Sequence, residues 1–275
     1  FLLQEVGSRL VDRLYDIDRT FNLAVELGAR GSTLCDQLSA RDKVSRLVQF
    51  YLSNSSSQTA NNCLVGDEEF LPFAPGSVDL FYSNLALHWT NDLPGALTQI
   101  RHSLRPNGFF VASMFGGNTL IELREALTYA EISEVGGISP RISPFAELAD
   151  AAALLQRAGF ALPVADSDTI TVTYGDAFAL MHDLRGMGET NALTARHNGF
   201  TRRSILFDAA ARYAKCHTNS EGRIPATFQI IYLTGWAPHK SQQKPLAPGT
   251  STARLAEALD AVELSAGENA DPIKE

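Results

Sequence analysis

The sequence is poor in cysteine, in long apolar runs and in positive charge. Its three cysteines, Cys35, Cys63 and Cys216, are odd in number and far apart. They fit neither a disulfide framework nor a zinc knuckle, and they indicate reduced thiols in an intracellular compartment. No apolar run approaches the roughly 18–20 residues that span a bilayer, so we expect no integral membrane segment. The 23 basic residues are outnumbered by 31 acidic ones, for a net charge of −8. That balance argues against a nucleic-acid partner, because phosphate contacts need clustered Lys and Arg.

Hydrophobic periodicity predicts strands that alternate with helices over most of the chain. We expect strands at 22–26, 45–53, 63–67, the first part of 77–89, 108–114, 168–174 and 226–236, and helices at 2–17, 32–40, 93–104, 119–131, 145–158, 176–185 and 202–216. This order predicts one α/β domain over about residues 1–240, with a seven-stranded, mostly parallel sheet whose last strand is antiparallel. Residues 241–275 turn polar, and we expect a flexible tail there with one short helix near 252–263.

The segment before the last strand is longer than a sheet requires. About 50 residues separate the last two strands, whereas neighbouring antiparallel strands can be joined by a two-residue turn. We expect residues 176–217 to form a helical lid over a cofactor pocket, with Met187, Glu189 and Asn191 of "GMGETN" facing an acceptor molecule. A plain helix-breaking turn is the alternative. The lid interpretation makes Glu189 and Asn191 candidate catalytic residues.

The stretch "NLAVELGARGSTLCDQL" is typical of a nucleotide-binding turn between a strand and a helix. An apolar run stops at Glu26, and Gly28 and Gly31 follow. Neither a GxGxxG nor a P-loop signature is present, and any α/β protein needs such tight turns. Ligands of doubly wound sheets bind at the carboxyl ends of the strands. In this chain those ends also carry Tyr51, the pair Asp67 and Glu68, and the pair Ser83 and Asn84.

The order of these pieces resembles a class I S-adenosylmethionine-dependent methyltransferase. "AVELGARGS" lies where that family has its glycine loop, "GDEEFLPFAPGSVDLFYSNLALHW" resembles the stretch from the adenine-contacting acid through strand four, and "LRPNGFF" resembles the turn into strand five. The resemblance implies a Rossmann-like fold and an S-adenosylmethionine site. That site would use Glu26, Gly28, Arg30, Gly31, Tyr51, Asp67, Glu68, Ser83 and Asn84, with no metal. The chain departs from the pattern at Arg30 and Ser32, which replace glycines, and at Tyr51, which replaces the acid that grips the ribose.

Further motifs resemble the mitochondrial complex I assembly factor 5 family and its bacterial relatives. These are "MFGGNTLIELREAL", "GGISPRISPF", "DLRGMGETNAL" and "IPATFQIIYLTGW". More distantly, the chain is similar to the malonyl-carrier-protein methyltransferase of biotin synthesis. The resemblance implies a protein acceptor, with a respiratory complex I subunit as one candidate, and a link to arginine hydroxylation. It implies a place in the mitochondrial matrix for a eukaryotic chain and in the cytoplasm for a bacterial one.

His88 follows the fourth predicted strand and is the third candidate catalytic residue. Its imidazole could orient an acceptor or take up a proton, and the alternative is that His88 and Trp89 simply pack under the next helix. Three functions stay open at this point. They are a methyltransferase, an arginine hydroxylase on the same fold, and an assembly factor that binds without turnover.

Overall fold

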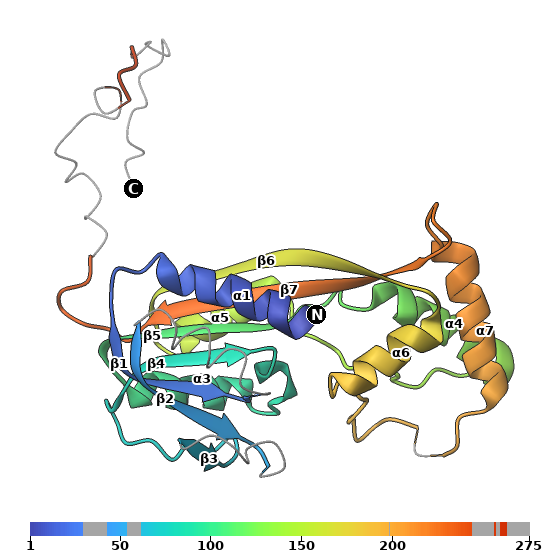
Figure 1. The fold of residues 1–275 in the computed structure, drawn as a ribbon, viewed down its shortest axis with the longest axis horizontal. Helices are drawn as coiled ribbons and strands as arrows, with labels where there is room; N and C mark the ends of the chain where they lie inside the picture. The colour runs from blue at the N-terminus through green and yellow to red at the C-terminus, as the bar shows by residue number, and fades with distance from the viewer. Residues whose placement is uncertain (30–42, 54–61, 198, 244–255, 257–258, 263–275) are drawn as a thin grey trace, which may run out of the picture. The chain divides into compact units, whose positions relative to one another are not determined.

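The computed structural model describes residues 1–29, 43–53, 62–197, 199–243, 256 and 259–262. The chain divides into two units, Phe1–His239 and Lys240–Glu275. The first unit holds all the named helices and strands (Figure 1). The helix predicted at 32–40 and most of the predicted tail lie outside the described residues, as do Arg30 and Gly31 of the glycine loop.

A seven-stranded sheet organises the first unit. Its strands are β1 (Phe21–Leu27), β2 (Val44–Tyr51), β3 (Cys63–Val65), β4 (Val78–Asn84), β5 (Leu104–Phe115), β6 (Ala161–Tyr174) and β7 (Ile224–Trp236), in the order β3-β2-β1-β4-β5-β7-β6. The pairs among β1 to β5 are parallel, and β7 is antiparallel to both β5 and β6. The predicted sheet, with its antiparallel last strand, is confirmed.

Strand β6 is longer than its sequence pattern predicted. We expected it at 168–174, but it begins at Ala161. The first half of β6 contains Pro163 and Asp166, which interrupt the alternation of apolar and polar residues that predicts a strand. These residues are tolerated because β6 is an edge strand, where a missing N–H breaks no ladder. The register with β7 also shifts between Ala161 and Val164, as it does where a bulge relieves a proline.

Helices cover both faces of the sheet. They are α1 (Leu2–Tyr15), α3 (Leu93–Ser103), α4 (Ile121–Val135), α5 (Leu148–Arg157), α6 (Ala177–Gly186) and α7 (Arg203–His217), with a short 3₁₀ helix, η2 (Leu87–Trp89). Successive strand residues point to opposite faces. Accordingly Ala24 joins the core under α1, α4, α6 and α7, while its neighbour Val25 joins the core under α3 and α5. Burial on both faces explains the continuous apolar strands seen in the sequence.

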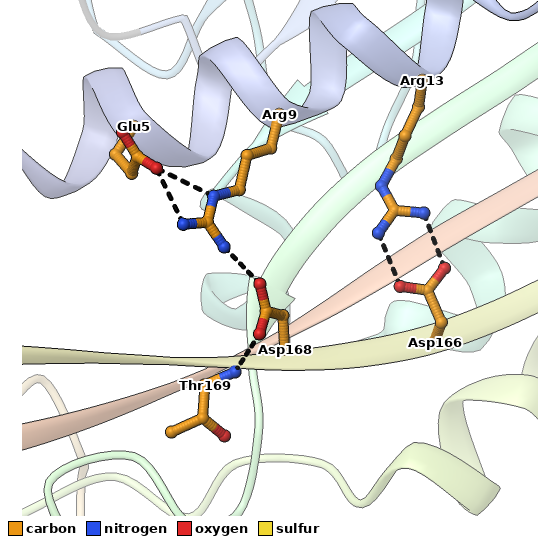
Figure 2. Close-up of polar contacts among 6 residues, drawn as sticks. All are labelled: Glu5, Arg9, Arg13, Asp166, Asp168 and Thr169. Atoms are coloured by element: carbon orange, nitrogen blue, oxygen red, sulfur yellow. Dashed lines mark hydrogen bonds and ion pairs between the residues drawn. The ribbon is translucent and has the colours of Figure 1, made fainter.

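Helix α1 is fastened to the sheet by two arginines (Figure 2). Both guanidinium nitrogens of Arg13 donate to the Asp166 carboxylate, at 2.7 and 2.6 Å. One turn earlier, Arg9 pairs with Glu5 on its own helix and with Asp168 on β6. The Arg13 guanidinium also lies 4.1 Å from the centre of the Tyr232 ring on β7. These contacts hold α1 across the antiparallel edge of the sheet.

Helices α4, α6 and α7 gather beyond the carboxyl end of β5 (Figure 1). Helix α7 packs on α4, and the rings of Phe178 on α6 and Phe207 on α7 meet edge to face at 5.5 Å. Between α6 and α7, residues 187–197 and 199–202 have no helix or strand. The predicted helical segment before the last strand thus has α6 and α7 close to the predicted bounds, and its connecting loop contributes to the site described next.

Candidate functional site

A cavity of about 320 Å³ opens at the carboxyl ends of β1 and β2. Its walls come from three regions: the ends of the strands, the turn after β4, and the loop after α6. The lining residues are Gly28, Ala29, Tyr51, Leu52, Ser53, Glu68, Ala86, Trp89, Gly188, Thr190 and Ala192. This is the end of a doubly wound sheet at which ligands bind, and we call it the first cavity.

Gly28 is a glycine for two reasons. Its φ is +67°, in the left-handed region that residues with a Cβ avoid. A Cβ added there would also lie 2.2 Å from Cβ of Ala86, well inside contact distance. The backbone at Gly28 therefore packs closely against the turn after β4, and Gly28 adds no side chain to the lining of the first cavity.

A second cavity of about 310 Å³ lies beside the first, between β5, α4 and the loop after α6. Most of its wall is apolar and aromatic, including Phe115, Phe145, Phe228, Leu120, Leu123, Leu127, Met181, Leu184 and Leu206. Polar groups also line it, among them His88, Arg141, Glu189 and Asn191. An apolar cavity with few convergent polar groups is the usual form of a small-molecule or side-chain binding site.

His88 and Glu189 form a buried pair in the second cavity. Nε2 of His88 lies 3.1 Å from Oε2 of Glu189, and the two side chains are only 3% and 9% exposed. The indole N–H of Trp89 donates to the other carboxylate oxygen at 3.4 Å. The His88 ring lies 4.7 Å from the ring of Phe115 and 5.9 Å from that of Phe145. Within the described part of the chain, Nδ1 of His88 is buried and has no hydrogen-bond partner, so a bound molecule could use it.

Residues 188–192, which we call the partition, separate the two cavities. Gly188, Thr190 and Ala192 line the first cavity, whereas Glu189, Thr190 and Asn191 line the second. The segment begins where α6 ends: Gly188 has a φ of +81°, and the N–H of Glu189 donates to the Leu184 carbonyl at 2.8 Å. Trp89 and Thr190 line both cavities. The two cavities are thus divided by a single strip of chain and one indole ring.

The partition is held from the side of the second cavity. The Asn191 side-chain amide donates to the carbonyl of Pro140 at 2.7 Å. Pro140 belongs to the loop 136–144, which Glu131 clamps: Ser139 donates its N–H at 2.8 Å and its hydroxyl at 2.6 Å, and Nε of Arg141 donates at 2.6 Å. These hydrogen bonds and the Arg141 charge lower the pKa of Glu131, although burial acts to raise it. The clamp also neutralises the Arg141 charge beside the second cavity.

Glu26 and Tyr51 are linked by a residue that sequence reasoning missed. The Gln49 amide donates to Glu26 at 2.9 Å and accepts from the Tyr51 hydroxyl at 3.0 Å. Glu26 is 2% exposed, and its burial raises its pKa to about 7 despite the hydrogen bond from Gln49. Glu26 is therefore a buried support beneath Tyr51, not a cavity residue. The period of two in β2 places Gln49 and Tyr51 on one face and could have found this link.

Ser83 and Asn84, two of the predicted cofactor residues, line neither cavity. Ser83 is fully buried, and its hydroxyl donates to the Leu27 carbonyl at 3.2 Å. The Asn84 amide donates to the Leu3 carbonyl of α1 at 2.9 Å and accepts from Ser113 at 3.0 Å. Both side chains hold strand β4 to its neighbours and line neither cavity.

Asp67 and Glu68, the acidic pair after β3, have different roles in the structure. Glu68 lines the first cavity. The Asp67 carboxylate instead accepts from the N–H of Glu69 at 2.9 Å, which closes a local turn.

The described residues contain no group of three or more His, Cys, Asp or Glu side chains that could hold a metal ion. Each of their helices is too short or too polar to cross a lipid bilayer.

Comparison with known sequences places the chain among methyltransferase-related proteins. Residues 25–112 match the sequence profile of a methyltransferase domain. The chain is 43% identical over 263 residues to the mitochondrial arginine-hydroxylase NDUFAF5 of Danio rerio, covering 94% of this chain and 81% of the relative. For the Homo sapiens protein of that name the identity is 42%, covering 94% and 76%. The malonyl-[acyl-carrier protein] O-methyltransferase of Xylella fastidiosa is 36% identical, covering 86% and 81%.

Solved structures resemble the fold. The YcgJ protein of Bacillus subtilis superposes with a TM-score of 0.58 at 14% identity, covering 84% of this chain and 99% of that one. A Haemonchus contortus phosphoethanolamine N-methyltransferase 2, solved with S-adenosyl-L-methionine, gives a TM-score of 0.51 at 12% identity, covering 85% and 52%. At these identities the likeness concerns the fold alone.

Proposed function

Because the chain belongs to the NDUFAF5 arginine-hydroxylase family and carries a methyltransferase domain, we propose that it uses S-adenosylmethionine to methylate an arginine nitrogen of a protein. The observation that carries this proposal is the pair of cavities divided by the partition. One cavity lies where a cofactor binds on this fold. The other presents a buried carboxylate among aromatic rings, a few atoms away through the shared wall.

The first cavity suits an adenosine cofactor. The bare backbone at Gly28 allows the close approach that such a ligand needs, and Glu68 and Tyr51 supply polar groups on opposite walls. When bound, S-adenosylmethionine supplies a methyl group on a sulfonium sulfur; its transfer breaks the sulfur–carbon bond, forms a nitrogen–carbon bond and leaves a neutral thioether. The chain itself has to orient the acceptor, exclude water and accept one proton.

The second cavity suits a guanidinium group. Two arginines already line this cavity: Arg141, which is paired with Glu131, and Arg185. The carboxylate that the lining offers to a ligand is that of Glu189, which is 9% exposed and pairs with His88. A carboxylate binds a guanidinium through two parallel N–H bonds, and aromatic rings stack on its plane. A guanidinium stays protonated throughout the physiological pH range, so it becomes a nucleophile only if a base removes a proton. Glu189 and His88 are placed to receive that proton.

Arginine hydroxylation is the second candidate, because relatives at 42–43% identity carry that name. Insertion of one oxygen atom into a C–H bond would need dioxygen and a two-electron reductant as co-reactants. The same second cavity would hold the arginine in either reaction. The relatives' name also supports a mitochondrial place of action for a eukaryotic chain, with a respiratory complex I subunit as the proposed partner. The third candidate is binding without turnover.

The test is a mass measurement on the acceptor. The purified chain is incubated with trideuteromethyl-labelled S-adenosylmethionine and each soluble complex I subunit of its own organism, and tryptic peptides are compared by mass. Methylation adds about 17 Da from the labelled donor, and hydroxylation adds about 16 Da without the label. Glu189→Gln, which keeps the size of the side chain, should abolish either product. Unchanged peptides, together with no heat of binding at millimolar cofactor, would leave only the non-catalytic alternative.

A further inference from the structure

Trp89 and Thr190 form a doorway between the two cavities, since these two residues contribute to both linings. A ligand in either cavity therefore has these two residues in its wall. Trp89 closes the 3₁₀ helix η2 at the end of β4, whereas Thr190 comes from the partition, 101 residues further along the chain. The doorway is therefore assembled by the fold.

The groups at the doorway carry negative charge or partial negative charge. The indole N–H of Trp89 donates to Oε1 of Glu189 at 3.4 Å, and the same carboxylate holds His88 through Oε2. This contact fixes the plane of the indole against the partition. The face of an indole ring carries negative charge from its quadrupole, and a hydrogen bond from its N–H to a carboxylate adds to that charge. Two arginines, Arg141 and Arg185, line the second cavity, and Arg141 is paired with Glu131 and Thr201.

We propose that Trp89 makes the doorway a cation site, which distinguishes the positively charged sulfonium of S-adenosylmethionine from the neutral thioether of S-adenosylhomocysteine. This inference rests on the proposed function and adds a specificity-determining residue to it. The ring attracts a cation through its face, and Trp is the strongest of the aromatic side chains in this role. The substrate form of the cofactor is thereby held, and the product form, which has lost the charge, is released.

The ratio of the affinity for S-adenosylmethionine to the affinity for S-adenosylhomocysteine measures this role of Trp89 without requiring any turnover. S-adenosylmethionine and S-adenosylhomocysteine are each titrated calorimetrically into the wild-type chain and into W89F, W89L and T190V. For W89L we expect affinity for S-adenosylmethionine to fall roughly tenfold, while affinity for S-adenosylhomocysteine changes less than twofold. W89F keeps an aromatic face and should keep most of the preference. T190V keeps the shape of the doorway wall without its hydroxyl and should leave the ratio unchanged.

The same titrations can overturn the proposal. If W89L and W89F weaken both ligands equally, the ring serves only as a wall. Thermal unfolding of each variant shows whether it is folded, and Glu189→Gln carries the test if W89L is not. If the wild-type chain binds neither ligand, the proposed cofactor itself is wrong, which is a different outcome from an unchanged ratio. Glu189→Gln removes the charge behind the indole and should shift the ratio in the same direction as W89L.

Discussion

Nε2 of His88 lies 3.1 Å from Oε2 of Glu189, although 101 positions separate the two residues in the chain. His88 is placed by the 3₁₀ helix that follows β4, and Glu189 by the partition that follows α6. The pair therefore joins the sheet to the helical segment before β7. Because both side chains are almost fully buried, water screens their interaction little, and the loss of either one leaves the other without its partner in an apolar wall.

This pair should behave as one unit in activity. His88→Ala and Glu189→Ala should each reduce product formation by roughly two orders of magnitude, as is typical of a lost general base. The double variant should be hardly worse than either single one, because groups that act together are not additive. His88 lines the second cavity but not the first. Because it does not touch the first cavity, His88→Ala should change the affinity for S-adenosylhomocysteine by less than about threefold. Additive losses would mean that the two residues act separately.

Gly28 should tolerate no side chain. Gly28→Ala introduces left-handed strain and a methyl group 2.2 Å from Cβ of Ala86. The matched control is Gly76→Ala, where φ is +61° but nothing lies within 4 Å of the new methyl group. In urea unfolding we expect a loss of about 1 kcal/mol for Gly76→Ala and about 2–4 kcal/mol for Gly28→Ala. Calorimetry should show weaker S-adenosylhomocysteine binding for Gly28→Ala alone. Equal losses in the two variants would show that the contact with Ala86 yields freely.

Glu26 should make stability fall as the pH rises. Burial raises its pKa from 4.5 to about 7 in the folded chain, so between these values the folded state binds more protons than the unfolded state. The free energy of unfolding then decreases with pH across this window, and the loss is complete above about pH 7. The loss is of the order of 3 kcal/mol. Glu26→Gln removes the charge, so its advantage over the wild type should grow from pH 5 to pH 8 in urea unfolding. A difference that is independent of pH would contradict the raised pKa.

Glu131 should be essential for the loop 136–144. Its carboxylate accepts from Ser139 and Arg141 and is itself 4% exposed. Glu131→Ala leaves Arg141 without its ion-pair partner, and we expect it to reduce the free energy of unfolding by about 3 kcal/mol. Because the pKa of Glu131 is lowered in the folded chain, its contribution should be present at neutral pH and lost as the pH falls. Glu134→Ala is the control, because Glu134 accepts only an exposed contact from Ser204. That change should cost less than about 0.5 kcal/mol. Similar losses for both variants would contradict the clamp.

The sequence by itself determined the sheet and the place of the first cavity. The middle of strand β5, residues 109–112, reads as a continuous apolar run because it is buried on both faces. Gly28 stands out because a tight turn after a buried strand has few alternatives. The antiparallel last strand was predicted from the strand–helix alternation and from the late pair of strands that breaks it. These features depend on local backbone preferences and on which faces are buried, and both leave a periodic trace in the residues.

Tertiary structure alone decided how the site is assembled. Ser83 and Asn84 end the same strand as the turn that bears Ala86, yet their polar atoms are used by Leu27, Leu3 and Ser113. No local pattern reveals which neighbour satisfies a buried hydroxyl or amide, because the partner comes from another element. The same holds for the contact of Glu189 with His88 and Trp89, and for the alternating sides of the partition. These relationships arise when chain segments about 100 residues apart pack against each other, and sequence periodicity records only how each segment meets the core.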